Sequence, residues 1–470
     1  MSGGCTERFD PMASIVQRGK SWAVVYYYKD ISGERKQKWE YYHTEQEALL
    51  RKDEVERKQK LGTFVVPNNV TVAEYLAEFV KNYGPLRWCE STFANNVGLI
   101  NNYITPILGG MQMQRINPMM ADAYVRKLMT TRPVERNGRH AKTEYLTASA
   151  IDKIVKLIKT AFKQATRHGI VESNPFDGVV LPKPEKHPKV VWSEEQIAEI
   201  LAACDDDRLL IVLHLAFACA MRINEICGLT WDNVHISDYD IRRGDAYLQV
   251  DRGNKRANKE ALAATRRDRV LLEFPACKSD TKTCLVQKPP KSDAGIRKIW
   301  LPEYVAKLLR QWQIRQMDIK RVLGGEYQDY GLVVAQDNGR PWEDASVRKA
   351  FYSLQERMDL PHVTFHSLRH SSATYKLIYS HGDVKSVQGD TGHSRAEMVV
   401  DLYAHAMDSQ RRKNAQHFQT AFYDKFVAEQ ETSKEVKQSP IDMVAVAKVL
   451  QQDPEMLKQL LRLLTADSDK

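Results

Sequence analysis

The chain has 470 residues, a formal net charge of +9 and a sequence pI near 9.0. At roughly 150 residues per domain, this length allows about three domains. The basic balance favours a polyanionic partner, with nucleic acid ahead of a membrane surface, and the absence of an apolar run of about 18 residues argues against a membrane span or a membrane partner.

The N-terminal text and the cysteines both favour a cytoplasmic protein. The N-terminal text MSGGCTERFDP lacks the basic-then-apolar pattern of a secretion signal, and Met12 is a candidate start. The seven cysteines include no CxxC pair, which argues against a zinc ribbon and favours reduced thiols in a cytoplasm. Cys219 and Cys227 are interpreted as core residues of an apolar helix.

Residues 12–62 predict a three-stranded β-sheet followed by a helix. The segments SIVQRG, SWAVVYYYKD and RKQKWEYYH alternate and are rich in β-branched and aromatic residues. Thr44 then opens a charged helix that ends at Gly62. The basic residues of the sheet and its turns could form either a solvated surface or a DNA-binding surface. The candidate DNA contacts are Arg18, Lys20, Lys36 and Lys38, with Lys29 and Arg35 beside them.

Residues 71–182 predict a helical domain, which opens on a capping box formed by Thr71 and Glu74. Further helices are expected over 91–104, with a stop at Pro106, from Asn117–Pro118 onward, and over 147–168. The last of these has an apolar stripe of Ile151, Ile154, Val155, Ile158, Phe162 and Ala165. Another face carries basic residues that are either solvated or bind DNA: Lys153, Lys156, Lys159, Lys163 and Arg167.

The remaining chain divides at a proline- and lysine-rich linker, LPKPEKHPK, over 181–189. Residues 190–425 predict a mainly helical domain with a small β-sheet, whose first helix starts at a capping box of Ser193 and Gln196. After a polar break, residues 430–470 predict one or two amphipathic helices that pack on this chain or on a partner.

Six side chains with useful chemistry stand in order within 190–425. Two arginines can clamp a phosphate through planar donor forks and offset the charge that builds on its oxygens. Two histidines can donate hydrogen bonds or move protons, a lysine can protonate a leaving oxygen, and a tyrosine can attack phosphorus. This set suits phosphoryl transfer on DNA without a metal or cofactor. The six are Arg222, Lys291, His366, Arg369, His393 and Tyr403.

The texts around these residues are AMRINEICGLTW, PPKSDAGIRKIWLP, TFHSLRHSSAT and TGHSRAEMVVDLYAH. Together they resemble the tyrosine recombinases, or phage-type integrases, and most of all the three-domain integrases of prophages and conjugative transposons. The resemblance covers residues 12–425. It implies a multidomain α+β fold with an arm-site DNA-binding domain over 12–62, a helical core-type DNA-binding domain over 71–182 and a catalytic domain over 190–425.

The resemblance also implies a role for each residue. Tyr403 would attack phosphorus and hold a 3′-phosphotyrosine, while His393 would hydrogen-bond the scissile phosphate. His366 and Arg369 match the HxxR motif of the family, and Glu225 would support Arg222 without reacting. Lys291 would protonate the leaving 5′-oxygen from a β-hairpin whose turn is Asp293–Gly295. The family usually has glycine where this chain has Ala220, which suggests slightly different backbone packing there.

The implied partners are double-stranded DNA attachment sites, a homotetramer that resolves a Holliday junction, an excisionase and a host DNA-bending protein. The implied location is the bacterial cytoplasm, at the nucleoid during the reaction.

Several alternatives stay open. Lys278, Lys282 and Lys288 compete with Lys291, and Tyr375, Tyr379 and Tyr423 compete with Tyr403. His370 and His366 could suggest a zinc pair, although no third ligand accompanies them. The rival functions are a type IB topoisomerase, a non-catalytic DNA-binding regulator and a metal-dependent nuclease.

Overall fold

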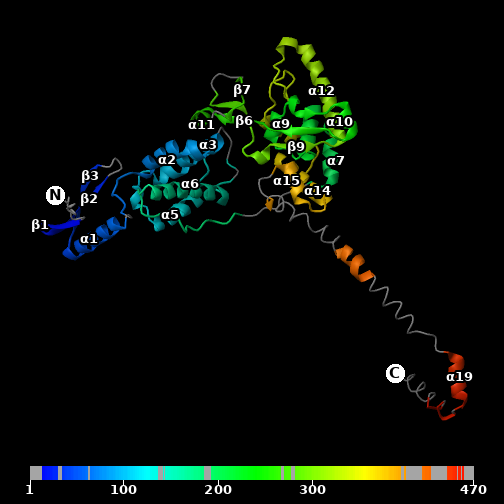
Figure 1. Ribbon diagram of the computed structural model, residues 1–470, viewed down its shortest axis with the longest axis horizontal. Helices are drawn as coiled ribbons and strands as arrows, with labels where there is room; N and C mark the ends of the chain where they lie inside the picture. The colour runs from blue at the N-terminus through cyan, green and yellow to red at the C-terminus, as the bar shows by residue number, and fades with distance from the viewer. Residues whose placement is uncertain are drawn as a thin grey trace, which may run out of the picture.

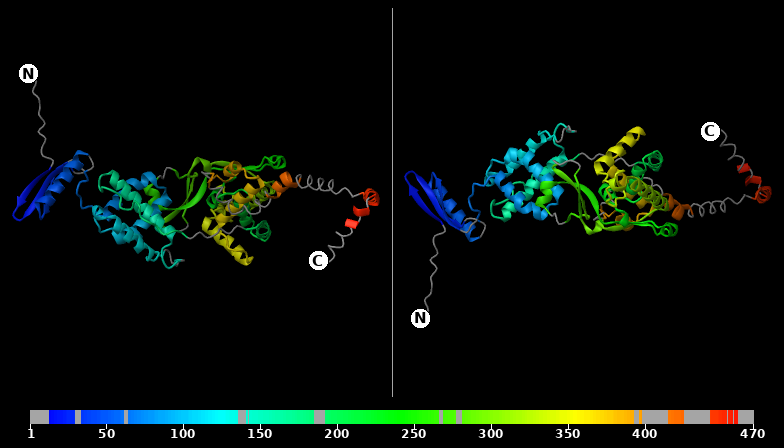
Figure 2. Two further views of the ribbon diagram at one scale, coloured as in Figure 1. Left: turned by 90° about the horizontal axis from the view of Figure 1, so that it is seen from below. Right: turned by 90° about the horizontal axis from the view of Figure 1, so that it is seen from above.

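The protein is described from a computed structural model, which covers residues 13–459 except 30–33, 62–63, 136–140, 142, 185–191, 266–268, 277–280, 393–395, 398–414, 425–441, 453 and 457. His393 and Tyr403 therefore lie outside the described residues. The described residues form three packed units that follow one another in chain order, as Figures 1 and 2 show. Each unit has a hydrophobic core of its own.

The first unit is an antiparallel sheet of order β1-β2-β3 with a helix on one face. Helix α1 buries Ala48 and Val55 against Val24 and Tyr26 of the sheet. Its N-cap, Thr44, takes part in a capping box, so the predicted start is confirmed. The elements are β1 (Ala13–Arg18), β2 (Ser21–Lys29), β3 (Arg35–Tyr42) and α1 (Glu45–Lys60).

Strand register divides the predicted basic residues of this sheet between its two faces. Lys36 and Lys38 pair with Tyr28 and Tyr26, so they share the face that carries α1. Arg18 lies on the opposite face, where its guanidinium stands 4.6 Å from the ring centroid of Trp39. The basic residues of the sheet therefore do not form one surface.

The second unit is helical, and the predicted capping box of Thr71 and Glu74 is present. The predicted stop at Pro106 is wrong, because the π-helix Ile100–Ile104 runs directly into α4 and the helical backbone continues through Pro106 to Leu108. All six residues of the predicted apolar stripe of α6 are buried. The elements are α2 (Val72–Arg87), α3 (Glu90–Leu99), the π-helix Ile100–Ile104, α4 (Thr105–Leu108), the 3₁₀ turn Met113–Arg115, α5 (Pro118–Met129) and α6 (Ala148–Arg167).

The third unit packs helices around the apolar helix α8 and contains two small sheets, of order β4-β5-β9 and β6-β8-β7. Its predicted capping box at Ser193 and Gln196 is present. Its helices are α7 (Glu194–Ala202), α8 (Asp207–Phe217), α9 (Ile223–Gly228), α10 (Asp238–Arg243), α11 (Lys259–Ala264), α12 (Glu303–Leu323), α13 (Asp344–Arg357), α14 (Phe365–Tyr379) and α15 (Val384–Thr391). Its strands are β4 (Val234–His235), β5 (Tyr247–Val250), β6 (Gly253–Asn258), β7 (Leu272–Phe274), β8 (Thr283–Lys288) and β9 (Arg297–Trp300), with 3₁₀ turns at Trp231–Asn233, Asp293–Gly295 and Gly324–Glu326.

The hairpin expected around Lys291 is wrong. The predicted turn exists as the 3₁₀ turn Asp293–Gly295, but the strands on either side of it belong to different sheets. Strand β8 pairs with β6 and β7, whereas β9 pairs with β5. Lys291 therefore lies in a connection between two sheets.

The β6-β8-β7 sheet and α11 reach from the third unit to the second. Figure 1 shows them beside α3, and both α11 and β6 contact α3. Farther along the chain, the described parts of the tail include the π-helix Gln419–Tyr423 and α19 (Met443–Gln452). None of the helices in the described ranges is long and apolar enough to cross a membrane.

Candidate active site

Arg222 stands at the N-cap of α9, after a tight connection from α8. Two residues earlier, Ala220 has a φ of 50°, in the left-handed region that favours glycine. The Arg222 backbone N–H donates to Glu225 Oε2 at 3.0 Å, its Nη1 donates to Glu225 Oε1 at 2.7 Å, and its Nη2 donates to the Gly392 carbonyl at 3.0 Å. Its side chain stays 38% exposed, so a phosphate can reach this guanidinium.

Glu225 lies between two arginines. Besides Arg222, it accepts a hydrogen bond from Arg297 Nη2 at 2.8 Å, and only 6% of Glu225 is exposed. Burial would raise the pKa of Glu225, but the charge and hydrogen bonds of Arg297 and Arg222 outweigh it and lower this pKa to about 2. Glu225 is therefore an anion that fixes the backbone and side chain of Arg222.

Arg369 is held on α14 with 1% exposure. Its Nη1 donates to the carbonyl of Ala220 and its Nη2 to the carbonyl of Thr391. Burial, followed by the charge of Arg222, lowers the pKa of Arg369 to about 9, which leaves it cationic at neutral pH. The two arginines therefore bond successive carbonyls, at 391 and 392, although they come from different helices.

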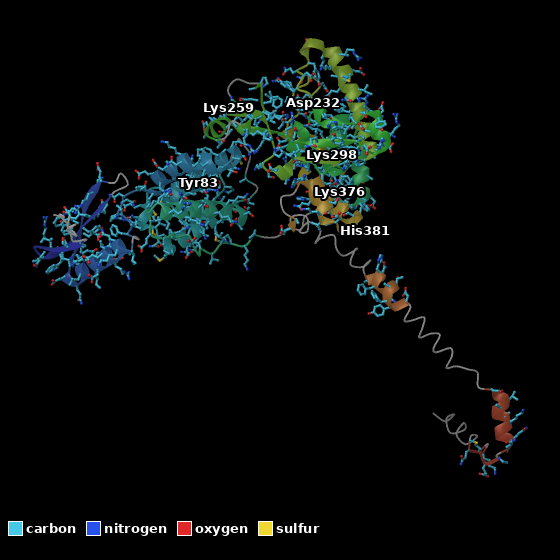
Figure 3. All side chains as sticks on the ribbon, viewed as in Figure 1. Tyr83, Asp232, Lys259, Lys298, Lys376 and His381 are labelled. Atoms are coloured by element: carbon cyan, nitrogen blue, oxygen red, sulfur yellow. The ribbon has the colours of Figure 1, made fainter. Side chains whose placement is uncertain are left out.

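The turn at Gly392 is packed tightly against Arg297, the third arginine of the site. Gly392 has a φ of 61°, and an added Cβ would stand 2.9 Å from the Ala294 carbonyl oxygen and 3.0 Å from Arg297 Cδ. Arg297 Nε also donates to the carbonyl of Asp390 at 2.8 Å. In the same helix end, Asp390 forms an ion pair with Lys376 at 2.5 Å, and Figure 3 shows Lys376 on α14. Residues 390–392, which directly precede the predicted His393, are thus fixed by three arginines.

His366 and Arg369 lie in the first turns of α14, as their spacing predicts, but in different surroundings. Arg369 is buried, whereas His366 is exposed. The His366 ring packs edge-on against His370, with 4.4 Å between centroids. Within the described ranges, no group of three or more His, Cys, Asp and Glu could hold a metal ion.

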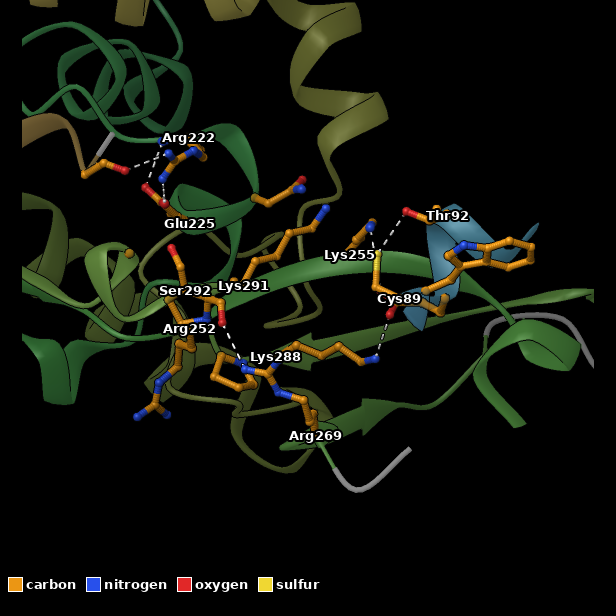
Figure 4. A pocket seen from close by; sticks show the side chains of 18 of the residues that line it. Cys89, Thr92, Arg222, Glu225, Arg252, Lys255, Arg269, Lys288, Lys291 and Ser292 are labelled. Atoms are coloured by element: carbon orange, nitrogen blue, oxygen red, sulfur yellow. Dashed lines mark hydrogen bonds and ion pairs between the residues drawn. The ribbon is translucent and has the colours of Figure 1, made fainter. Parts of the chain in front are cut away.

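Lys291 and Arg222 line one cavity of about 730 Å³ between the second and third units. Figure 4 shows Lys291 extending into the space between the Arg222–Glu225 pair and Lys255. The opposite wall includes Trp88, Cys89 and Glu90, from the α2–α3 connection and the start of α3. The basic residues of the lining are Arg87, Arg222, Arg252, Lys255, Arg269, Lys288 and Lys291.

The lysines that compete with Lys291 and the tyrosines that compete with Tyr403 differ in their surroundings. Lys288 also lines the cavity, but its Nζ donates to Glu90 Oε2 at 3.2 Å, whereas Lys282 is not part of the lining. Lys278 lies outside the described residues. The hydroxyl of Tyr375 donates to the Trp192 carbonyl at 3.0 Å and that of Tyr379 to Glu194 at 2.7 Å, and Tyr423 is exposed.

Sequence reasoning missed Arg297. Its side chain is 7% exposed and connects Glu225 with the backbone of residues 390 and 295. The available signal was the alternation of β9, in which Arg297 and Ile299 are buried while Lys298 and Trp300 are exposed. An arginine at an inward position of a strand requires an anionic partner.

The basic face predicted for α6 is exposed along its length, at Lys153, Lys156, Lys159, Lys163 and Arg167. Two of its lysines have ion pairs, Lys156 with Asp152 at 2.7 Å and Lys159 with Asp177 at 3.0 Å. Exposed pairs of this kind contribute roughly 0–1 kcal/mol, so DNA phosphates can displace them at small cost.

Comparison with known proteins decides the family. Residues 191–268 and 272–410 match the phage integrase family, 71–129 match the SAM-like N-terminal domain of phage integrases, and 14–59 match the arm DNA-binding domain. The chain belongs to the phage integrase family, the tyrosine recombinases. The three matched segments correspond to the three packed units of the fold.

Two relatives and one solved structure illustrate the likeness. A XerC-like tyrosine recombinase of Caldanaerobacter subterraneus subsp. tengcongensis is 24% identical over 410 residues, which cover 85% of this chain and 96% of the relative. The transposase from transposon Tn916 of Enterococcus faecalis is 26% identical over 54% of this chain and 58% of its own length. The Tn1549 transposon integrase bound to a circular intermediate DNA has the same fold, with a TM-score of 0.56 and 18% identity over 74% of this chain and 99% of the other.

Proposed function

We propose that this tyrosine recombinase is the integrase of a mobile element, which cuts and rejoins double-stranded DNA at specific attachment sites. The observation that carries the proposal is the convergence of Arg222 and Arg369 on the carbonyls of 391 and 392, beside a basic cavity that Lys291 lines. Two guanidinium forks beside a general acid suit a phosphodiester, whose nonbridging oxygens gain charge as phosphorus is attacked.

In the proposed reaction, the Tyr403 hydroxyl gives its proton to solvent as its oxygen attacks phosphorus, and the bond from phosphorus to the 5′-oxygen breaks. Lys291 gives its proton to that 5′-oxygen, so the products are a 3′-phosphotyrosine and a free 5′-hydroxyl. His366 and His393 donate hydrogen bonds to the phosphate, while Arg222 and Arg369 balance its charge. Attack by a 5′-hydroxyl of another strand reverses these steps, and because the ester conserves the bond energy, the reaction requires no cofactor.

Strand exchange by this route passes through a Holliday junction within a homotetramer on DNA. The arm-type sheet of 12–62 and the basic face of α6, in the helical domain of 71–182, would bind separate DNA segments, with the catalytic domain of 190–425 at the crossover. The basic residues of the sheet and the basic face of α6 belong to different packed units, which supports this division. An excisionase and a host DNA-bending protein would set the direction.

The decisive experiment uses a nicked suicide duplex that carries the ends of the element and traps the covalent intermediate. The wild-type protein is expected to form an adduct that survives denaturation, and Tyr403→Phe is expected to bind the same duplex without forming it. Tyr423→Phe is the matched control, because it removes the hydroxyl of an exposed tyrosine. An adduct that persists in Tyr403→Phe would refute the assignment of the nucleophile.

A further inference from the structure

Glu90 is a buried acid in a wall of the basic cavity. It is the first residue of α3 and is 7% exposed. Its carboxylate lies 3.2 Å from Lys288 Nζ and 3.6 Å from Lys255 Nζ, both of which belong to the third unit. Glu90 therefore joins the helical unit to the catalytic unit through two ion pairs.

The charge on Glu90 is stable at neutral pH. Burial would raise the pKa of Glu90, but its own backbone N–H, the hydrogen bond from Lys288 and the charges of Lys288 and Lys255 lower this pKa below its ordinary value. The side chains of Lys288 and Lys255 are 14% and 30% exposed, so these ion pairs are more shielded from water than typical surface pairs. The bridge is thus a partly desolvated contact between units.

The two lysines cannot follow Glu90 easily, because their strands are fixed to the active site. Asn254, next to Lys255, donates to the Cys227 carbonyl at 2.7 Å, and Gln287, next to Lys288, donates to the Gly228 carbonyl at 3.3 Å. Both carbonyls belong to α9, which begins just after Arg222. Any separation of the bridge must therefore move α3 away from the lysines.

DNA entry requires such a separation. A cavity of about 730 Å³ is no larger than a cube of about 9 Å on each edge, whereas the two grooves of a duplex are about 8.5 Å and 7.5 Å deep, so the duplex is about 16 Å across or wider. A duplex that reaches Arg222 and Lys291 would also bring phosphates to Lys255 and Lys288, where the Glu90 carboxylate would repel them. The carboxylate and a DNA phosphate compete for the same two ammonium groups.

We propose that Glu90, Lys255 and Lys288 form an interdomain latch that holds the active site closed without DNA and that DNA phosphates replace Glu90 on the two lysines. This inference rests on the proposed function, since it takes DNA as the ligand of the cavity. The latch reduces the fraction of molecules that can accept DNA, and the apparent affinity falls with that fraction.

The test measures association and dissociation rates of a fluorescent core-site duplex with the full-length protein. Glu90→Gln retains the shape of the side chain and removes its charge, so the association rate constant is expected to rise about three- to tenfold with little change in dissociation. Glu172→Gln is the matched control. It makes the same change in net charge at another inter-unit ion pair, to Lys58 at 2.9 Å, outside the cavity lining, and should leave both rates unchanged.

A second measurement tests the phosphate contacts. In the Glu90→Gln background, each of Lys255→Gln and Lys288→Gln should reduce the slope of log K against log salt by about 0.9, as expected for the loss of one phosphate contact. An unchanged slope in both would overturn the role of the lysines. Unchanged association with faster dissociation in Glu90→Gln would show that the bridge retains bound DNA, and would overturn the latch.

The suicide duplex separates this inference from the proposed function. If the wild-type protein forms no covalent adduct, the proposed function fails. If the wild-type protein and Glu90→Gln both form the adduct but associate with DNA at equal rates, only the latch fails.

Discussion

Replacement of Glu225 by glutamine is expected to destabilise the catalytic unit, because it leaves Arg297 buried beside Arg222 without a counter-charge. The pKa of Glu225 is lowered from its ordinary value of 4.5 to about 2. At about 1.4 kcal/mol per pKa unit, the charged form stabilises the folded state by roughly 3 kcal/mol at pH 7. Loss of one partner of a buried ion pair typically costs about 3–5 kcal/mol, which agrees.

The sign of the pH dependence follows from the lowered pKa. Above about pH 4.5 the carboxylate is charged in both folded and unfolded chains, and its full contribution is present. As the pH falls toward about 2, the unfolded chain takes up the proton first and the contribution is lost. At pH 3, less than half of it should remain, so the difference in unfolding free energy between wild type and Glu225→Gln should narrow by about 2 kcal/mol.

The assay is urea unfolding followed by tryptophan fluorescence at pH 7 and pH 3. Five of the eight tryptophans, among them the buried Trp192, lie in the catalytic unit, so most of the signal reports on it. Glu343→Gln provides the control, because Glu343 also binds an arginine, Arg256, but in a pair with 43% and 28% exposed side chains, and should cost at most about 1 kcal/mol. A free energy of unfolding for Glu225→Gln within 1 kcal/mol of wild type at pH 7 would refute the argument.

Three further predictions concern the reaction itself. Arg222→Lys and Arg369→Lys should each lower the rate of adduct formation by roughly 100-fold or more, because lysine lacks the planar fork; near-wild-type rates would mark these arginines as structural. Lys291→Ala should cleave ordinary DNA slowly and recover on a substrate with a 5′-thiolate leaving group, which requires little protonation. Lys298, whose ammonium lies 3.6 Å from the ring centroid of Tyr247, provides the control: Lys298→Ala should cleave the ordinary and the 5′-thiolate substrate at the same rate relative to wild type. Rescue of Lys298→Ala but not of Lys291→Ala by the 5′-thiolate would contradict the role of Lys291. Deletion of 1–65 should preserve covalent cleavage of the core site and abolish efficient recombination on substrates with distal arm sites; full-rate recombination by the truncated protein would refute the arm-site role.

Local features of the fold could be predicted because they depend on neighbouring residues. The capping boxes at Thr71 and Ser193 follow from residues three positions apart, and the buried stripe of α6 follows from helical periodicity. The connection around Lys291 was predicted wrongly, because strand pairing depends on residues that are far apart in the sequence. Strand β8 pairs with β6, whose residues lie about 30 positions earlier, and no local pattern states that pairing.

The site residues also divide into those that local sequence identifies and those whose partners are distant in the sequence. The order of the six candidate residues and the HxxR spacing could be read along the chain, and Glu225 could be expected beside Arg222 because one helical turn separates them. Arg297 could not be identified, because its partners are Glu225 and the backbone at 390, which approach it only in the folded chain. Glu90 was missed for the same reason, since its lysines come from another unit.

The charges on the two sides of the cavity link DNA binding at the arginines to the release of Glu90 in the proposed latch. Around residues 390–392, beside the Lys376–Asp390 ion pair, three guanidinium groups, of Arg222, Arg297 and Arg369, face the carboxylate of Glu225, and after burial the charges of Arg222 and Arg297 lower the pKa of Arg369 further. An excess cation in a buried place is unfavourable until an anion arrives, and a phosphodiester that gains charge in the transition state offsets it best. On the other side of the cavity, Glu90 already supplies the anion for two lysines. The same duplex would therefore satisfy the arginines and displace Glu90, which couples filling of the active site to release of the helical unit.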